Sequence, residues 1–271
     1  MLVENSAFTI WEAEKQLFDS RQCNQIRKLT PEIIDYEMKF SHSKTELKLY
    51  QLTQEGLEHF VSTYGSTYKT LYLKDCEHIR DFSPLSNLHD LEAVRIEGCR
   101  NNDGLWDMSQ NGSLRILSIH DAKKIVANPM QIQTSSVLEE VRLWGGGFDN
   151  KYTLESLSCF WGMKSLKRID LNDIRLKNHN LDILATLPQL EEFHFDASML
   201  TTEEIAWICA KYPHIYGKCL KAYTTHEVAC LNDIRICGYR KPGLDLSRDQ
   251  NRLDKYVAEF NALVKKYQNE I

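Results

Sequence analysis

Cysteine and histidine gather in the C-terminal third of the chain, where their side chains could bind zinc. Thiolate and imidazole are among the ligands that zinc prefers in proteins. The candidates are Cys209, His214, Cys219, His226, Cys230 and Cys237. The stretches between them, of four, four, six, three and six residues, match no compact zinc finger. The sequence therefore favours core and turn positions for these residues, and it predicts neither a metal nor a cofactor.

Motifs that would support catalysis are missing from the sequence. It contains no G-x-x-x-x-G-K-[ST], no G-x-G-x-x-G after a strand, no H-E-x-x-H and no G-x-S-x-G. The carboxylates of Glu139 and Glu140, like those of Glu203 and Glu204, are adjacent in sequence and so face different directions, which prevents them from acting as an acid–base pair. We therefore expect a protein that is not an enzyme.

An internal repeat organises most of the chain. Six segments share one pattern of apolar positions, beginning at Tyr68, Leu91, Leu114, Leu138, Leu166 and Leu190. The fourth position of each pattern is residue 71, 94, 117, 141, 169 or 193, so successive copies are 23, 23, 24, 28 and 24 residues apart. A further copy lies upstream at Leu47-x-Leu49, and Leu231-x-x-Ile234-x-Ile236 has the pattern of a terminal copy, with a degenerate unit at 215–223 between it and the six.

These copies resemble the leucine-rich repeat family, whose template is L-x-x-L-x-L-x-x-N/C-x-L with a period of roughly 20 to 29 residues. Cys76 and Cys99 match the Asn/Cys position, whereas Ala122, Gly146, Ile174 and Ser198 depart from it, which leaves the side-chain hydrogen-bond ladder incomplete. The resemblance covers about residues 45–240 and is closest to compact bacterial leucine-rich repeat proteins without a signal sequence. It implies an α/β horseshoe solenoid of about eight irregular repeats, with a parallel sheet on its concave face.

The segments outside the repeats are expected to cap the solenoid. In residues 1–44, Tyr36, Met38 and Phe40 alternate as in a strand. In residues 241–271, Ser247-x-x-Gln250 has the pattern of a capping box that opens an amphipathic helix. This helix either seals the last repeat or docks a partner.

The residues between the apolar positions of each strand should point outward and form the working surface, because side chains alternate along a strand. The candidate partner-binding residues are Arg95, Glu97, His120, Arg142, Trp144, Asp170, Asn172, Asp173, His194 and Asp196. Trp144 is expected to contact a partner, unless a loop covers it or the register slips by one residue at the glycines that follow. Trp106, Trp161 and Trp207 fall on return segments and should pack in the core. Trp and Arg are enriched at interface hot spots.

Asp170, Asp173 and Asp196 predict an acidic cluster on this surface, which could attract a partner with a basic surface. It could equally be an ordinary solvated face. A metal site built from Asn172, His194 and Asp196 is conceivable, but the sequence supplies no second shell for it.

Composition narrows the class of protein further. A net charge of −5 and a pI near 6.0 argue against general binding to nucleic acid or to anionic membranes. No apolar run reaches the roughly 18 residues of a membrane span, and acidic residues in the first 16 positions do not suit a secretory signal. The eight cysteines contain no C-x-x-C pair and are expected to be thiols, although their even number leaves disulfides open.

We therefore expect a cytoplasmic, monomeric, non-enzymatic scaffold that binds a partner protein through its concave sheet. Two alternatives are an adaptor that docks a second component through its terminal helix and an immunity or antitoxin-like inhibitor of a basic toxin.

Overall fold

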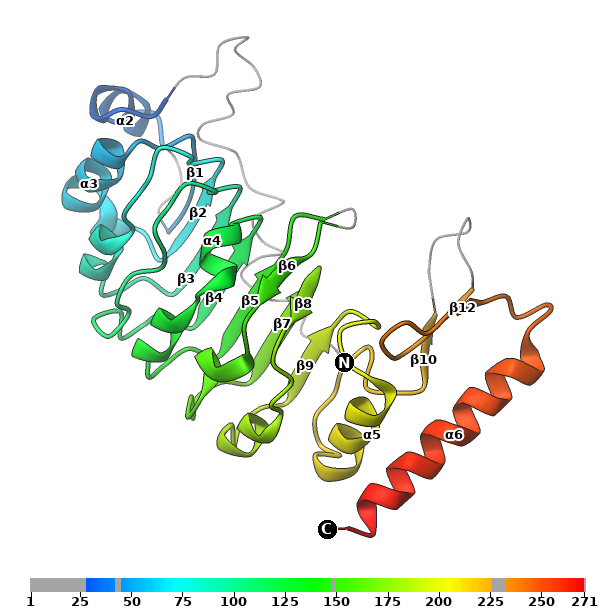
Figure 1. Ribbon diagram of the computed structural model, residues 1–271. Helices are drawn as coiled ribbons and strands as arrows, with labels where there is room; N and C mark the ends of the chain where they lie inside the picture. Colours follow the sequence, from blue (N-terminus) through cyan, green and yellow to red (C-terminus); the bar gives the residue numbers. More distant parts are fainter. Residues whose placement is uncertain (1–27, 42–44, 148–149, 226–232, 271) are drawn as a thin grey trace.

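The protein is a mixed α/β structure in which parallel strands lie side by side and the connecting segments run back on one side of them (Figure 1). The computed structural model describes residues 28–41, 45–147, 150–225 and 233–270. Helices α2 (Pro31–Met38) and α3 (Gln54–Thr63) lie at the N-terminal end of the strand array (Figure 1). Helices α5 (Thr202–Lys211) and α6 (Gln250–Gln268) lie at the other end.

The main sheet has seven strands whose spatial order follows the chain, and all of its pairings are parallel. Its strands are β1 (Glu46–Tyr50), β2 (Thr70–Lys74), β3 (Ala93–Glu97), β4 (Ile116–His120), β5 (Glu140–Trp144), β7 (Arg168–Asn172) and β9 (Glu192–Phe195). The register pairs the same repeat position in every neighbour, as in Leu71↔Val94 and Val94↔Leu117. The alignment of the six predicted copies and of the upstream copy at Leu47 is thus confirmed.

The longest repeat keeps this register in spite of its 28 residues. Val141 of β5 still pairs with Ile169 of β7. The segment between them includes β6 (Tyr152–Leu154), which pairs in parallel with β8 (Ile174–Leu176) in a separate two-stranded sheet. The extra length is therefore taken up beside the main sheet and does not shift the strands that form it.

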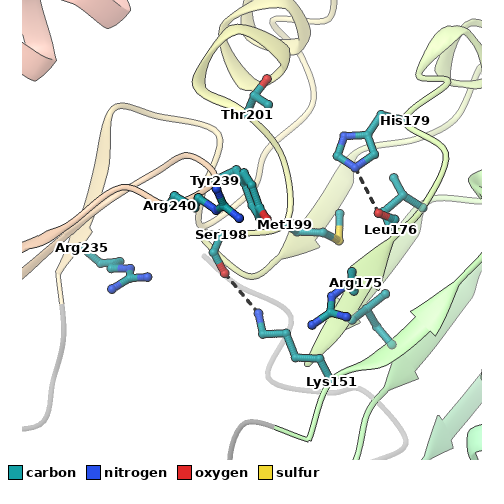
Figure 2. A pocket seen from close by; sticks show the side chains of 11 residues that line it. Lys151, Arg175, Leu176, His179, Ser198, Met199, Thr201, Arg235, Tyr239 and Arg240 are labelled. Carbon is teal, nitrogen blue, oxygen red and sulfur yellow. Dashed lines mark hydrogen bonds between the residues drawn. The ribbon is translucent and has the colours of Figure 1, made fainter.

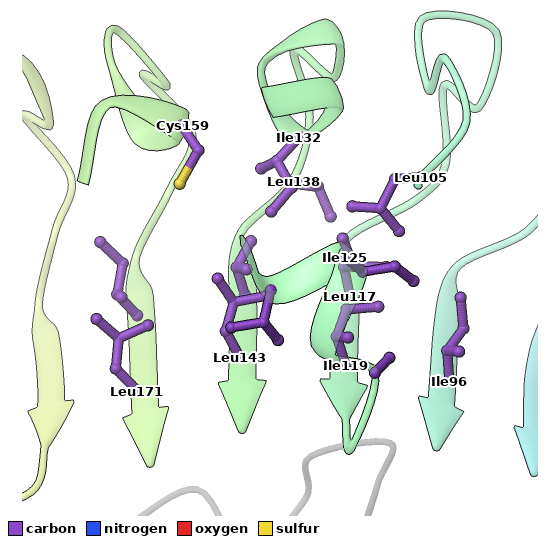
Figure 3. Packing of buried hydrophobic residues seen from close by; sticks show 14 of the residues in the cluster. Ile96, Leu105, Leu117, Ile119, Ile125, Ile132, Leu138, Leu143, Cys159 and Leu171 are labelled. Carbon is purple, nitrogen blue, oxygen red and sulfur yellow. The ribbon is translucent and has the colours of Figure 1, made fainter. Parts of the chain in front are cut away.

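The apolar repeat positions fill the space between the sheet and the return segments. Leu117, Ile119 and Leu143 project from the strands toward Ile132 and Leu105 of the returns, and each is buried (Figure 3). Burying one such side chain stabilises the fold by about 1.5–3 kcal/mol before entropy is counted. No single repeat could enclose these side chains alone, so stacking of neighbours creates the core.

Short helices lie in the return segments, and longer or additional helices lie at the two ends of the strand array. The α-helices are α2 (Pro31–Met38), α3 (Gln54–Thr63), α4 (Lys123–Ala127), α5 (Thr202–Lys211) and α6 (Gln250–Gln268). The 3₁₀ helices are η2 (Gly65–Thr67), η3 (Ser83–Asn87), η4 (Met130–Thr134), η5 (Leu157–Phe160) and η6 (Asp182–Thr186). The side chain of Thr53 caps α3 by accepting from Gly56 N–H, and Thr201 and Glu204 form a capping box at the start of α5.

A left-handed residue ends most strands of the main sheet. The residue directly after each of β1, β2, β3, β4 and β7 has a φ between 47° and 68°. These residues are, in order, Gln51, Asp75, Gly98, Asp121 and Asp173. Asp tolerates this conformation better than most residues, and Gly adopts it without cost. Asp173 was predicted as a strand residue, but it directly follows the end of β7 at Asn172.

The buried cysteines at the Asn/Cys position hold the turn that follows the strand. The thiol of Cys76 donates to Lys74 O at 3.3 Å and accepts from Leu52 N–H at 3.4 Å, and the thiol of Cys99 lies 3.5 Å from Glu97 O. Six cysteines fall in the described ranges and all are free thiols, as expected. Cys23 and Cys230 lie outside those ranges.

The N-terminal segment differs from the prediction. Residues 31–38 form helix α2 in place of the expected strand through Tyr36, Met38 and Phe40. Pro31 at its first turn favours a helix start, and the helix turns Ile34 into the core while Tyr36 and Phe40 face solvent. Met38 is half-buried against the core, so the three alternating residues do not share one face. Leu29 forms a parallel bridge with Leu52, which follows β1, and the rest of the predicted cap, residues 1–27 and 42–44, lies outside the described residues.

The last predicted repeat does not join the main sheet. The segment Ile234–Ile236 forms β11, which pairs antiparallel with β10 (Tyr223–Thr225) and β12 (Gly243–Leu244). The degenerate unit contributes only a single parallel bridge, Glu192↔Tyr216. Among the described strands, β9 is therefore the last member of the main sheet.

Helix α6 packs along α5 and closes this end of the core with Phe260, while Leu253 packs against the three-stranded sheet. Its start differs from the predicted capping box. Asp249 is the N-cap residue, and Ser247 Oγ instead donates to Asp245 Oδ1 at 2.6 Å.

Candidate functional site

The side of the main sheet away from the core, here called the outer face, is built from the first, third and fifth residues of each strand. In β5 these are Glu140, Arg142 and Trp144, which alternate with the buried Val141 and Leu143. Of the predicted site residues, all but Asp173 lie in these rows or, for Asp196, directly beyond β9. The rows also contain residues that the sequence analysis passed over.

Trp144 lies on the outer face as predicted, and it stacks on His120 of the neighbouring strand. The ring centroids are 4.2 Å apart with an angle of 15° between the planes. The Nε1 atom of Trp144 is shielded from solvent and has no hydrogen-bond partner. The indole is thus a half-buried platform in the sheet surface and not a freely projecting side chain.

His120 is held neutral by its surroundings. Burial, followed by the positive charge of Arg95, lowers its pKa to about 3. Arg95 Nη2 donates to Nδ1 at 3.2 Å, so Nε2 carries the proton and donates to Ser118 Oγ at 2.9 Å. Both imidazole nitrogens are therefore engaged, and His120 has no free nitrogen to serve as an acid, a base or a metal ligand.

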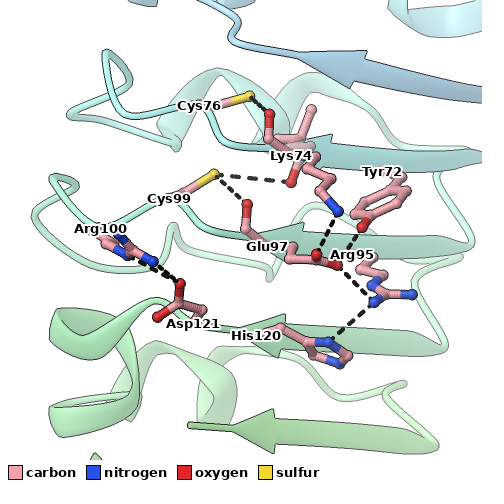
Figure 4. Close-up of polar contacts among 10 residues, drawn as sticks. Tyr72, Lys74, Cys76, Arg95, Glu97, Cys99, Arg100, His120 and Asp121 are labelled. Carbon is pink, nitrogen blue, oxygen red and sulfur yellow. Dashed lines mark hydrogen bonds and ion pairs between the residues drawn. The ribbon is translucent and has the colours of Figure 1, made fainter. Parts of the chain in front are cut away.

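Glu97 is the centre of the network on the N-terminal half of the outer face (Figure 4). It accepts from Lys74 Nζ at 2.8 Å, from Arg95 Nη2 at 2.7 Å and from the hydroxyl of Tyr72. Burial by itself would raise the pKa of Glu97, but the hydrogen bonds from Lys74 and Tyr72 and the charge of Arg95 lower it to about 2. Arg95 also stacks over the Tyr72 ring, 4.7 Å from its centroid.

A second network crosses the C-terminal half of the outer face. Arg168 lies 3.1 Å from Glu192, 3.7 Å from Asp170 and 3.8 Å from Glu140, and Glu140 also pairs with Arg142. Glu192 accepts in turn from His194 Nε2 at 2.8 Å.

Glu140, Arg168 and Glu192 are functional candidates that sequence reasoning missed. Each is the first residue of its strand, β5, β7 or β9, whereas the predicted site residues within strands come from the third and fifth positions. Extending the period-two alternation by one residue toward the N-terminus would have found them.

The predicted acidic cluster does not form as a patch of unpaired carboxylates. Asp170 is 14% exposed and lies beside Arg168. Asp196 Oδ2 accepts from Lys151 Nζ at 2.9 Å and from the backbone N–H of Asp173 at 3.0 Å. At the equivalent position after β2, β3, β4 and β5, the backbone N–H donates to a carbonyl oxygen of the neighbouring strand. The surface around these residues therefore carries balanced charge, and the expected attraction of a basic partner loses its main support.

The residues considered for a metal site are engaged elsewhere. His194 Nε2 binds Glu192 and Asp196 binds Lys151, so they do not converge with Asn172 on one point. Within the parts of the chain that the structure describes, no three His, Cys, Asp or Glu side chains are placed to hold a metal ion. Two members of the Cys/His-rich stretch, His226 and Cys230, lie outside those parts.

The return-segment tryptophans differ from one another. Trp106 is buried as predicted and donates from Nε1 to Asn111 Oδ1 at 2.8 Å. Trp207 is half-buried against the core and the ring of Tyr212. Trp161 is 57% exposed, so the prediction of core packing is wrong for it. It follows the short helix η5 and precedes the left-handed Gly162, where the chain turns at the surface.

Shielded polar atoms without a hydrogen bond concentrate on the outer face. Of the seven such side-chain atoms among the described residues, five belong to it: Tyr50 Oη, Arg95 Nε, Trp144 Nε1, Arg168 Nε and His194 Nδ1. An unpaired buried polar atom costs about 1–3 kcal/mol. Such atoms mark a surface that would gain from additional hydrogen-bond partners.

No protein-family model matches the chain, and no curated protein matches it. No helix in the described ranges is long and apolar enough to cross a membrane.

Proposed function

We propose that the protein is a leucine-rich repeat solenoid that acts as a non-enzymatic scaffold, binding a folded partner protein through the outer face of its main sheet, which would be the concave face. The observation that carries this proposal is the unbroken register of seven parallel strands, which aligns the outward residues of these strands into continuous rows. Parallel strands with returns on one side are the arrangement that the repeat pattern implies.

The composition of the outer face supports protein binding. Residue types that are enriched at interface hot spots occur along it: Tyr72, Arg95, Arg142, Trp144 and Arg168. Their charges are balanced by Glu97, Glu140 and Glu192, so the partner would present both signs rather than a uniformly basic surface. On docking, a rearrangement of side chains would give hydrogen bonds to the shielded unpaired polar atoms described above.

Free cysteines support a reducing compartment. Six thiols stay unpaired in the described part of the chain, which is the ordinary state of cysteine in cytosolic proteins. We therefore propose that the scaffold acts in the cytoplasm.

Affinity capture from the native host, followed by mass spectrometry, tests the proposal. The wild type is compared with Trp144→Ala, which alters the outer face, and with Trp161→Ala, which removes an exposed tryptophan from a return segment. We expect one protein to be captured by the wild type and by Trp161→Ala but not by Trp144→Ala, with all three remaining folded. If only the Trp161→Ala variant failed to capture the protein, the binding surface would lie on the return segments, which would contradict the proposal.

A further inference from the structure

A cavity of about 740 Å³ lies where three parts of the fold meet (Figure 2). One wall comes from Lys151, before β6, and from β8. A second wall comes from the loop between β9 and α5, and a third from β11 and the turn that follows it. Ligand pockets in proteins are typically about 300–1,000 Å³. None of this region belongs to the outer-face networks except through the Lys151–Asp196 pair.

Four cationic side chains line the cavity, with Lys151 and Arg175 on the first wall and Arg235 and Arg240 on the third. No acidic residue is among the described residues that line it. Lys151 pairs with Asp196, but in the described part of the chain no carboxylate oxygen lies within 4 Å of Arg175, Arg235 or Arg240. The three arginines thus have no carboxylate partner in the described part of the chain, and an anion in the cavity would supply their counter-charge.

The turn that carries Tyr239 and Arg240 is fixed against the opposite wall. Gly238 N–H donates to Ala197 O at 2.7 Å, and Thr202 Oγ1 donates to Cys237 O at 3.1 Å. Gly238 has φ +145° and an added Cβ would overlap Thr202 Oγ1, so only glycine suits this position. Arg240 itself is left-handed, with φ +58°. Strained residues of this kind persist where the surrounding structure holds them, often at binding sites.

The remaining lining supplies polar and apolar contacts. Ser198 Oγ accepts from Lys151 Nζ at 3.1 Å, which places a hydroxyl next to one cation. The ring of Tyr239 is 55% exposed and lies at the cavity beside Met199 (Figure 2). His179 also lines the cavity, but Glu204 and Leu176 O occupy both of its nitrogens, so it acts as a fixed wall.

We infer that this cavity binds a compact small molecule carrying phosphate groups. Guanidinium groups match phosphate oxygens in a bidentate geometry, and three of them with an ammonium group suit a ligand with several negative charges. The cations converge in one cavity and do not form a stripe, and the chain is acidic as a whole, which favours a small molecule over a nucleic acid. Tyr239 and Met199 would contact an apolar part of the ligand. This inference is independent of the proposed partner binding.

Calorimetric titration with inorganic tripolyphosphate, at constant ionic strength, tests the inference. We expect saturable binding to the wild-type protein with one site. Arg175→Gln and Arg235→Gln should each weaken it at least tenfold. Arg240→Lys, which keeps the charge and loses the planar fork, should weaken it less than Arg240→Gln. Lys164→Gln removes an exposed cation remote from the cavity and should leave binding unchanged.

Three results would overturn the inference. The first is no saturable binding of tripolyphosphate. The second is an equal loss of binding in Lys164→Gln and in the cavity variants, because binding would then follow net charge alone. The third is tighter binding of a glutamate-rich peptide than of tripolyphosphate through the same arginines, which would make the cavity a receptor for an acidic protein segment. Thermal melting without ligand confirms that each variant remains folded.

Discussion

The imidazole of His120 lies flat on the indole of Trp144, with 4.2 Å between the ring centroids, and the two residues occupy paired positions on adjacent strands. The pair joins the two halves of the outer face, because His120 accepts from Arg95 on one side and Trp144 follows Arg142 along β5 on the other. The stacked pair therefore has two roles: it holds adjacent strands together, and it forms part of the surface proposed to bind the partner.

Trp144→Ala should cost stability as well as partner binding. A stacked aromatic pair contributes about 0.5–1.5 kcal/mol beyond its buried area, so we expect the free energy of unfolding in urea to fall by roughly 1–2 kcal/mol. Trp144→Phe, which keeps a stacking ring, should recover most of that loss. If Trp144→Ala unfolds at the same urea concentration as the wild type, the stack does not stabilise the sheet.

His120 should make stability depend on pH. Its pKa is about 3 in the folded protein and 6.5 when the imidazole is fully solvated, so between these values the unfolded chain binds the extra proton. Stability is therefore fully present above pH 6.5 and falls as pH decreases toward 3, by up to about 1.4 kcal/mol per unit.

The measurement is urea unfolding at intervals from pH 7 to pH 5, which lies above the range where Glu97 titrates. His120→Gln should show a shallower slope than the wild type over this range. Parallel slopes for the two proteins would mean that His120 is not buried in its neutral form.

The repeat pattern predicted the register of the main sheet but not its ends. Leu71, Val94 and Leu117 repeat at a nearly constant spacing, so their alignment could be derived from sequence alone. Ile234 and Ile236 satisfy the same local pattern, yet they pair antiparallel in another sheet. The pattern reports only that alternate residues are buried, and it does not specify which strand lies next to them.

The candidate site was predicted in part for the same reason. Alternation placed Trp144 and His120 on the outer face, but it could not show that Asp196 accepts from Lys151, which is 45 residues away. The basic cavity gave no signal in the sequence, because Lys151 and Arg175 lie far from Arg235 and Arg240 in the chain, and no repeat position marks them as neighbours before the protein folds.

Gly145 should be intolerant of a side chain. It directly follows β5 in the strand-end position that left-handed residues occupy in most other repeats, and an added Cβ would overlap the carbonyl oxygen of Asp173. We expect Gly145→Ala to lower the free energy of unfolding by about 2 kcal/mol or more through strain. An added Cβ on Gly112 would meet no atom within 4 Å, so Gly112→Ala should be neutral or stabilise by about 0.4–1 kcal/mol. Equal effects of the two changes on urea unfolding would contradict this account.

Helix α6 should behave as a cap rather than as a docking helix. Phe260 is buried in the main core at the end of the array, while Asn261 beside it faces solvent. Phe260→Ala should destabilise the protein by about 3–5 kcal/mol, as for other buried phenylalanines, and Asn261→Ala should change it by less than about 0.5 kcal/mol.

Deletion of residues 247–271 separates the two roles of this helix. If α6 is a cap, the deleted protein aggregates or melts at lower temperature, because the core of the last repeat is exposed. If α6 is the docking element of an adaptor, the shortened protein keeps its melting temperature and loses one captured partner that the Trp144→Ala variant retains. The second outcome would shift the proposed function from the outer face to the terminal helix.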